Sequence, residues 1–372
     1  MKDQILFSTV QCGNGLAIGV VTLNNPTALN ALTFDMLAAT YSQLKMWLED
    51  PFVVAVLIDS SSDKAFCAGG DVKTMYHQAQ TSQGKEWLTD YFSIEYRCDH
   101  LLHRYPKPVI AWGHGIVMGG GMGLFMGASH RVVTSQSRLA MPEINIGLYP
   151  DVGGTWFLNR LPEGVGLFLA MTGAPLNAVD ALDSNFATVC IDNQRKSQII
   201  ESLCQVAWSG DDNDFNAVSV VLERYAQIPT LPSHLLTWSL HLQQACRSDS
   251  LTQCIANLDA IENKDPWLEN ALATLQQGSG ITAHICFRQL NQYQALSLEE
   301  VFKLELALSV QCVLNGDFQE GVRALLVEKT KDPHWRFPRA QAVPESYVDQ
   351  LFTPPWPQNP LHDLGAMPGS FL

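Results

Sequence analysis

The chain has 372 residues and is short of charge. Charged side chains make up 16% of it, against a usual share of about 25% in globular proteins, while apolar ones reach 47%. The formal net charge of -14 argues against electrostatic attraction to nucleic acid or to an anionic membrane surface. Taken alone, this charge also argues against a polyanionic ligand. We expect a compact globular protein with no nucleic-acid partner.

Long apolar runs and paired cysteines are both missing. Runs such as 53–58 and 165–171 are far shorter than the ~20 apolar residues of a membrane-spanning helix, so we expect no membrane partner. The nine cysteines are scattered, odd in number and without a CxxC pair, which argues against a disulfide framework and a zinc site. Since the start also lacks a leader-like apolar segment, the sequence predicts a cytoplasmic protein.

Several common catalytic and cofactor motifs are absent as well. The chain has no G-x-G-x-x-G dinucleotide fingerprint, no P-loop, no G-x-S-x-G nucleophile elbow and no H-E-x-x-H zinc helix. His100 and His103 form an HxxH pair, but a third ligand is lacking. We therefore predict no metal site and no nucleotide cofactor.

The N-terminal half alternates β-rich runs with helical patterns, which is typical of an α/β domain. The predicted strands are residues 18–23, 53–58, 109–112 and 131–134. A helix is predicted over 34–49, with Thr33 as N-cap and with Leu37, Tyr41, Leu44 and Leu48 on its buried face. A second helix is predicted over 85–104, ended by the prolines that follow it.

Strand-like runs disappear near residue 195, and helical patterns dominate from there on. We predict two domains, an α/β domain over 1–195 and a helical C-terminal region over 196–372. The last twenty residues contain five prolines and no lysine or arginine, so we expect an extended tail that lies over the surface.

Glycine is concentrated at two places that each follow a strand. Residues 113–123 read GHGIVMGGGMG, and residues 65–71 read AFCAGGD. Glycine at this density lets backbone N–H groups approach a ligand closely. Two such turns can direct two N–H groups at one point, as an oxyanion hole for a thioester or ester carbonyl requires. Cys67 has no adjacent base, so we interpret it as a packing residue rather than a thiol nucleophile.

These motifs together resemble the crotonase (enoyl-CoA hydratase/isomerase) superfamily. Besides AFCAGGD and HGIVMGGG, the chain has MPE at 141–143, GLYPDVGG at 147–154, LNNP at 23–26 and ALNAL at 28–32, in the order and spacing of that family. The resemblance implies a fold of repeated ββα units in a spiral, and an acyl-CoA whose thioester oxygen faces two backbone amides. Carried onto this chain, those amides belong to Gly70 and Gly120.

Departures from the family pattern indicate a branch of it. Hydratases of the family use two glutamates, but here Gly123 stands at the first position and only Glu143 is retained, so hydration is disfavoured. The combination of Glu143 with Asp151 and with Glu95 looks like the 3-hydroxyisobutyryl-CoA hydrolase branch, a thioesterase of valine catabolism. The C-terminal run DFQEGVRA at 317–324, followed by DPHW at 332–335, resembles that branch too.

The resemblance implies thioester hydrolysis with coenzyme A as part of the substrate and with no cofactor. Glu143 is expected to act as general base for water or as a nucleophile that forms an anhydride, and the sequence leaves both routes open. Asp151 is expected to orient the 3-hydroxyl of the substrate or the attacking water, and Glu95 to bind the same hydroxyl. If Glu143 and Asp151 share a pocket, repulsion raises one pKa.

Other interpretations stay open at this point. The protein could be a hydratase or isomerase of the same fold, a hydrolase that prefers a 3-hydroxypropionyl thioester, or a non-catalytic acyl-CoA-binding protein. Lys64 and Lys73 flank the first glycine turn and could bind the coenzyme A phosphates, or they could be ordinary surface lysines. A homo-oligomer is possible, since trimers and hexamers are common in the superfamily.

Overall fold

The computed structural model describes residues 4–365. These residues form two compact units, and each unit is assembled from three segments of the chain. The first unit combines the residues up to 70 with 98–139 and 175–236. The second combines 71–97 and 140–174 with the residues from 237 on.

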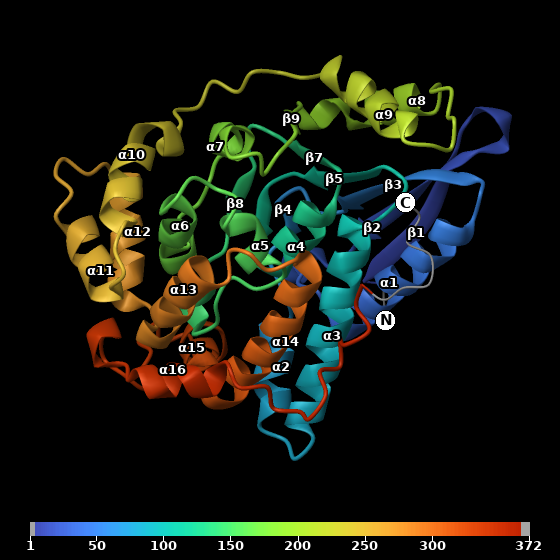
Figure 1. Ribbon diagram of the computed structural model, residues 1–372. Coiled ribbons are helices and arrows are strands. Elements are labelled where there is room, and N and C mark those ends of the chain that lie inside the picture. The colour runs from blue at the N-terminus through green and yellow to red at the C-terminus, as the bar shows by residue number, and fades with distance from the viewer. Residues whose placement is uncertain (1–3, 366–372) are drawn as a thin grey trace. The chain divides into compact units, whose positions relative to one another are not determined.

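The first unit is built on a six-stranded sheet with the strand order β1-β2-β3-β5-β7-β9 (Figure 1). Its strands are β1 (Ile5–Gln11), β2 (Ala17–Leu23), β3 (Val53–Ser60), β5 (Val109–Gly113), β7 (His130–Val133) and β9 (Val189–Cys190). Only the β1–β2 pair is antiparallel, and the other neighbours are parallel. A parallel sheet is normally covered on both faces, which explains the nearly continuous burial along β3 and β5.

A second, three-stranded sheet has the order β4-β6-β8. Its strands are β4 (Ala65–Cys67), β6 (Ile116–Met118) and β8 (Arg138–Ala140). The chain therefore alternates between the sheets, because β3, β5 and β7 lie in the large sheet and each is followed by a strand of the small one. Helices α2 (Val72–Ala79) and α4 (Gly120–Gly127) follow the first two such pairs. This order confirms the predicted ββα repeats.

Alternate side chains of the large sheet form the core of the first unit. Residues two apart on one strand point to the same face, as do the buried Ala55 and Leu57 of β3 and Ile110 and Trp112 of β5. They pack with apolar side chains of α8 (Lys196–Leu203) and α9 (Asn213–Glu223). This unit also contains α1 (Phe34–Glu49), α4 and α7 (Ala178–Asp183).

Helix α1 begins where the sequence predicts, because the Thr33 side chain accepts a hydrogen bond from the Met36 N–H. Its predicted buried face is partly wrong. Leu37 and Leu44 are buried as expected, but Tyr41 and Leu48 are only half-buried, and the buried set is Met36, Leu37, Thr40, Leu44 and Trp47. The reason is that the Trp47 ring packs against β2, a contact that the helical spacing alone does not reveal. A Cβ on Gly19 of β2 would lie 2.8 Å from the Trp47 ring, so the missing side chain makes room for that ring.

The second unit is helical, and Figure 1 shows its C-terminal helices from yellow to red. In chain order its helices are α2, α3 (Gly84–His103, of which residues up to 97 belong here), α5 (Gly154–Leu158), α6 (Val165–Thr172), α10 (His234–Cys246, from residue 237), α11 (Leu251–Asp259), α12 (Pro266–Gln277), α13 (Gly280–Gln292), α14 (Leu298–Asn315), α15 (Phe318–Val322) and α16 (Glu345–Leu351). Short 3₁₀ turns add to them, among them Glu143–Ile146 (η3).

The predicted strands and the two predicted helices are confirmed, with boundaries that agree to within three residues. As expected, the last described strand ends at Cys190 and the helices and turns follow it. The division at residue 195 marks this change of character and stays a prediction about domains, since each compact unit takes segments from both sides of it. Within residues 4–365, no helix is both long and apolar enough to cross a membrane.

The predicted C-terminal tail lies along α3 as far as it belongs to the described residues, and residues 366–372 lie outside them. Arg97 forms an ion pair with Asp363 at 2.6 Å, and it also donates to the Pro360 carbonyl at 3.0 Å. The Asn359 amide donates to the Lys303 carbonyl at 2.8 Å.

Helix α4 can approach β4 only because its second residue is glycine. A Cβ on Gly121 would lie 2.5 Å from the backbone oxygen of Cys67, which no real Cβ tolerates. We expect Gly121→Ala to lower the free energy of unfolding by about 1–3 kcal/mol, the usual cost of overpacking. A Cβ on the exposed Gly13 would meet no other atom within 4 Å, so Gly13→Ala is the matched control. Equal urea midpoints for the two variants would contradict this packing.

Candidate active site

The first glycine turn follows β4 in the first unit. Gly69 adopts a φ of 119°, a conformation that glycine reaches without steric cost. Two backbone bonds hold the turn, from the Leu32 N–H to the Gly69 carbonyl at 2.9 Å and from the Ala68 N–H to the Leu29 carbonyl at 3.0 Å. Among the described backbone hydrogen bonds, none uses the N–H of Gly70.

The second glycine turn follows β6, in the same unit. Gly119 precedes α4 with a φ of 52° and a ψ of -128°, and Gly120 is the first residue of the helix. A helix leaves its first N–H groups without an internal acceptor, so the buried Gly120 N–H can bind a ligand oxygen. The positive end of the helix dipole favours negative charge at this position.

The structure brings these two turns together. Strands β4 and β6 are parallel neighbours, so their carboxyl ends meet at one edge of the small sheet. A Cβ on Gly69 would lie only 3.8 Å from the Gly120 nitrogen. The two predicted N–H groups, those of Gly70 and Gly120, therefore belong to turns in contact. This arrangement can stabilise negative charge on one oxygen atom.

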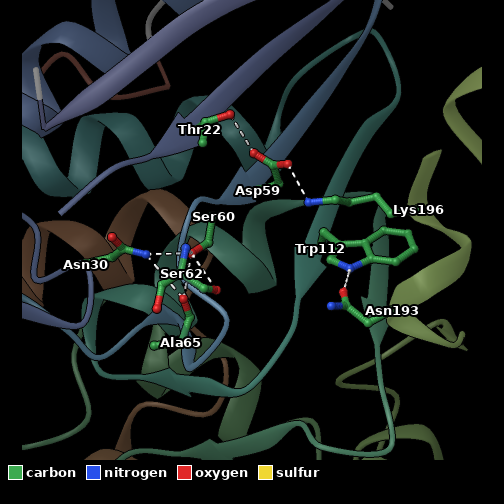
Figure 2. A network of polar contacts seen from close by, with 9 residues as sticks. All are labelled: Thr22, Asn30, Asp59, Ser60, Ser62, Ala65, Trp112, Asn193 and Lys196. Carbon is green, nitrogen blue, oxygen red and sulfur yellow. Dashed lines mark hydrogen bonds and ion pairs between the residues drawn. The ribbon is translucent and has the colours of Figure 1, made fainter. Parts of the chain in front are cut away.

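Asn30 supports the first turn, and sequence reasoning did not give it this role. Figure 2 shows its amide pointing at the loop between β3 and β4. The amide nitrogen lies 2.7 Å from Ser60 Oγ, 2.9 Å from the Phe66 carbonyl and 3.2 Å from the Ala65 carbonyl. Asn30 also adopts a φ of 59°, which asparagine tolerates better than most residues. The only sequence signal is its place in the ALNAL motif.

Other contacts of Figure 2 tie the large sheet to α8. Asp59 at the end of β3 accepts from Thr22 Oγ1 at 2.7 Å and pairs with Lys196 at 2.8 Å.

Cys67 is fully buried, and its thiol donates to the Asn30 carbonyl at 3.1 Å. Its surroundings are those of a packing residue.

Glu143 lies in the second unit, at the start of η3, directly after Pro142. Its carbonyl accepts from the Leu148 N–H at 3.1 Å, which closes the loop behind it. The side chain is 6% exposed, and its Oε2 has no hydrogen-bond partner among the described residues. A buried carboxylate oxygen without a partner costs free energy, so Oε2 is available to accept a hydrogen bond from a ligand or from water.

Asp151 lies in the next turn of the same unit, and this turn is strained. Val152 follows with a φ of 49° and Gly153 with a φ of 87°. A β-branched residue in the left-handed region is a genuine outlier and needs support from its surroundings. The buried Glu305 of α14 gives that support, because its carboxylate accepts from the Gly153 N–H at 2.8 Å and from the Thr155 N–H at 3.0 Å.

Burial changes the pKa values of these acids. It raises the pKa of Glu143 well above its ordinary range, and the nearby Asp151 carboxylate raises it further. Burial also raises the pKa of Asp151 to about 6, against the lowering effect of a hydrogen bond from Tyr96. The carboxyls of Glu143 and Asp151 are therefore near enough to interact electrostatically, so that one of them ionises less readily than the other.

Glu95 lies nearby on α3 and is 2% exposed. Its neighbour Tyr96 donates to Asp151 Oδ2 at 2.7 Å, and the Glu95 charge is among those that raise the pKa of Tyr96. Glu95 thus interacts with Tyr96, and its predicted role at the substrate hydroxyl stays a prediction. Lys64 and Lys73, by contrast, are exposed, and no group of metal-ligating side chains occurs within the described residues.

Tyr96, Ser309 and Glu305 are residues of this site that sequence reasoning missed. A signal for two of them was present in α14, where Glu305 and Ser309 lie four residues apart on an otherwise apolar buried face. Charged side chains are almost never fully buried without partners, so a glutamate between two leucines in such a helix indicates a polar network.

Known proteins resemble this chain over most of its length. The sequence profile of the enoyl-CoA hydratase/isomerase family matches residues 18–352. The mitochondrial 3-hydroxyisobutyryl-CoA hydrolase of Gallus gallus is 33% identical over 90% of this chain and 86% of that protein. The protein of the same name from Homo sapiens is 34% identical over the same shares of the two chains.

Solved structures agree with the fold. A carnitinyl-CoA dehydratase from Mycobacterium thermoresistibile has a TM-score of 0.84 and 32% identity, over 96% of this chain and 98% of its own. An enoyl-CoA hydratase from Rhodobacter sphaeroides has a TM-score of 0.82 and 30% identity, over 96% and 99%. The predicted crotonase-like α/β fold is confirmed.

The carboxylate of Glu305 can be tested for its support of the Asp151 turn. We expect Glu305→Ala to lower the free energy of unfolding by about 2–6 kcal/mol, because two buried N–H groups lose their acceptor at about 1–3 kcal/mol each. Glu305→Gln keeps one acceptor oxygen and is expected to lose roughly half as much. Urea unfolding followed by circular dichroism measures both variants. Equal losses in the two variants would show that the turn does not depend on the carboxylate.

Proposed function

Since the chain belongs to the enoyl-CoA hydratase/isomerase family, we propose that it hydrolyses the thioester of a 3-hydroxyacyl-CoA to a free hydroxy acid and coenzyme A. The observation that carries this proposal is the buried pair of Glu143 and Asp151, in which Glu143 has an oxygen without a partner among the described residues. Gly123, where hydratases of the family have a second glutamate, argues in the same direction.

The proposed substrate is 3-hydroxyisobutyryl-CoA, which would place the reaction in valine catabolism. The names of the vertebrate relatives support this choice. A 3-hydroxypropionyl thioester stays an alternative, because it differs only by a methyl group. The cytoplasmic location and a homo-oligomeric state stay predictions, and the relatives are named as mitochondrial proteins.

The proposed mechanism begins with the carbonyl oxygen of the thioester, which accepts hydrogen bonds from the N–H groups of Gly70 and Gly120. These donors stabilise the negative charge that develops when the carbonyl carbon is attacked. Asp151 and Glu95 bind the 3-hydroxyl of the acyl group and so orient the substrate. Lys64 and Lys73 stay candidates for the coenzyme A phosphates.

Glu143 has two proposed routes. As a general base it removes a proton from water while the water oxygen bonds to the carbonyl carbon. The C–S bond then breaks, and the departing sulfur takes the proton from Glu143. As a nucleophile, its carboxylate bonds to the carbonyl carbon and expels the thiolate, and water then hydrolyses the resulting anhydride. Both routes require Glu143 to be ionised, and its raised pKa makes it a stronger base than an exposed carboxylate.

Hydration of an enoyl-CoA is the second candidate, favoured by the names of the two solved structures described above. Addition of water to a double bond needs a proton donor and a proton acceptor, which the two glutamates supply in hydratases of the family. Gly123 lies buried within α4 and cannot supply either. Tight binding of acyl-CoA without turnover would instead indicate a non-catalytic binding protein.

Glu143→Gln is expected to reduce release of thiol from 3-hydroxyisobutyryl-CoA by at least about 100-fold, the usual contribution of a positioned acid-base group. A thiol reagent follows the release, and an enoyl-CoA absorbance assay follows hydration in parallel. Glu201→Gln, an exposed change on α8, is the control and is expected to retain full activity. Undiminished release by Glu143→Gln, or hydration without release by the unaltered protein, would contradict the proposal.

A further inference from the structure

A continuous chain of hydroxyl contacts runs from Asp151 into the core of the second unit. The Tyr96 hydroxyl lies 2.7 Å from Asp151 Oδ2 and 2.6 Å from Ser309 Oγ. Ser309 Oγ lies 2.6 Å from the Tyr149 hydroxyl, which is 2.9 Å from the backbone carbonyl oxygen of Glu305. Tyr96, Ser309 and Tyr149 are each 0% exposed, so the chain is shielded from solvent.

The protons of this chain can be counted. Each contact between two oxygen atoms at hydrogen-bond distance needs one proton between them. The chain contains four such contacts, but its three hydroxyl groups carry only three protons, and the Glu305 carbonyl can only accept. The fourth proton has to come from Asp151.

An ionised Asp151 leaves the chain incomplete. Tyr96 then donates to the carboxylate, and one of the remaining contacts consists of two oxygen atoms that face each other without a proton. In a low-dielectric core such an unsatisfied contact is costly. With a proton on Asp151 the direction of the first contact reverses. Asp151 then donates to Tyr96, Tyr96 to Ser309, Ser309 to Tyr149 and Tyr149 to the carbonyl, so that every contact is filled.

The titratable groups around Asp151 also favour its neutral form. Within residues 4–365, the titratable groups seen to interact with its charge are Tyr96 beside Glu95 on α3, Glu143 on η3, Tyr149 on the preceding turn, and Glu305 and Cys312 on α14. None of them is a cation. Burial, which disfavours the carboxylate, is the main cause of the raised pKa of Asp151.

We infer that Ser309 and Tyr149, acting through the Tyr96 hydroxyl, are positioning residues that favour a proton on Asp151 and thereby allow the neighbouring Glu143 to ionise. This inference rests on the proposed function, because it assigns the two protonation states that hydrolysis requires. A charged Asp151 would repel a charged Glu143, whereas a neutral one does not. The other oxygen of neutral Asp151, Oδ1, can accept a hydrogen bond from the hydroxyl of the substrate.

Removal of a hydroxyl group that does not itself contact Asp151 should lower the proton affinity of Asp151. In Tyr149→Phe the Tyr96–Asp151 and Tyr96–Ser309 contacts remain. With Asp151 ionised, the Tyr96 hydroxyl fills the first and the Ser309 hydroxyl the second. In Ser309→Ala the Tyr96–Asp151 and Tyr149–carbonyl contacts remain, and each is filled by its own tyrosine. Both variants should therefore lower the proton affinity of Asp151 by about tenfold, the worth of one hydrogen bond.

Tyr96→Phe is the matched control, because it removes the same kind of hydroxyl from the same chain. Like the other two variants it leaves no contact of the chain unfilled when Asp151 is ionised, but it alone also deprives the carboxylate of its only side-chain donor among the described residues. Because a hydrogen bond to a charged group is roughly twice as strong as a neutral one, the proton affinity of Asp151 should stay the same or rise. A merely structural role for the three residues would predict no such difference in sign.

Infrared spectroscopy of the full chain measures the protonation directly. A protonated carboxyl gives a C=O stretching band that ionisation removes, and the part of the band lost in Asp151→Asn identifies Asp151. We expect its titration midpoint to fall in Ser309→Ala and in Tyr149→Phe but not in Tyr96→Phe. Ser309→Ala keeps the inference testable if Tyr149→Phe does not fold. Unchanged midpoints in the folded variants would overturn the inference.

The pH profile of hydrolysis gives a second readout. Hydrolysis requires ionised Glu143, so the rate rises as the pH passes upward through its pKa. In Ser309→Ala and Tyr149→Phe the ionised Asp151 raises that pKa, and the rising limb of kcat should move to higher pH. In Tyr96→Phe it should not. A lower kcat with an unmoved limb in all three variants would overturn the inference.

The two proposals fail in different ways. If no 3-hydroxyacyl-CoA is hydrolysed, the proposed function is wrong, while the infrared titration still reports whether the hydroxyl chain holds the proton of Asp151. If hydrolysis occurs and the midpoint of Asp151 does not respond to Ser309→Ala, the function stands and the assignment of the proton is wrong.

Discussion

The turn that carries Asp151 depends on the two hydrogen bonds that the Glu305 carboxylate accepts from the backbone that follows. The Gly153 N–H donates to one carboxylate oxygen at 2.8 Å and the Thr155 N–H to the other at 3.0 Å, and these bonds hold Val152 and Gly153 in the left-handed region. A valine does not adopt this conformation without such support. The turn points Asp151 at Tyr96 and keeps it next to Glu143. Because Glu305 belongs to α14, the helical C-terminal region takes part in the candidate site.

In the first unit, the two glycine turns depend on residues that have no side chain. Gly69 allows the positive φ of the first turn, and Gly121 lets α4 approach β4 closely enough for the two turns to touch. Asn30 then fixes the strand that leads into the first turn. The two units thus position their candidate site residues in different ways. One positions backbone N–H groups through close packing, and the other positions carboxyls through buried hydrogen bonds.

Local signals in the sequence were sufficient for much of this. Alternating β-rich and helical patterns predicted the strands, and a capping threonine predicted the start of α1. The glycine turns were visible because glycine density has a direct conformational meaning. The buried face of α1 was partly missed, since Trp47 packs over Gly19 of another strand. The hydroxyl chain was missed for the same kind of reason, because Tyr96 and Ser309 are 213 positions apart and no local pattern joins them.

The proposed function requires Gly70 and Gly120 to act on the same thioester as Glu143 and Asp151. A crystal structure with a ketone analogue of 3-hydroxyisobutyryl-CoA, in which a methylene group replaces the sulfur, tests it most directly. The account predicts the carbonyl oxygen at about 2.7–3.1 Å from both glycine nitrogens, Glu143 facing the carbonyl carbon, and Asp151 at the 3-hydroxyl. A carbonyl oxygen bound elsewhere, with Glu143 away from the carbonyl carbon, would contradict it.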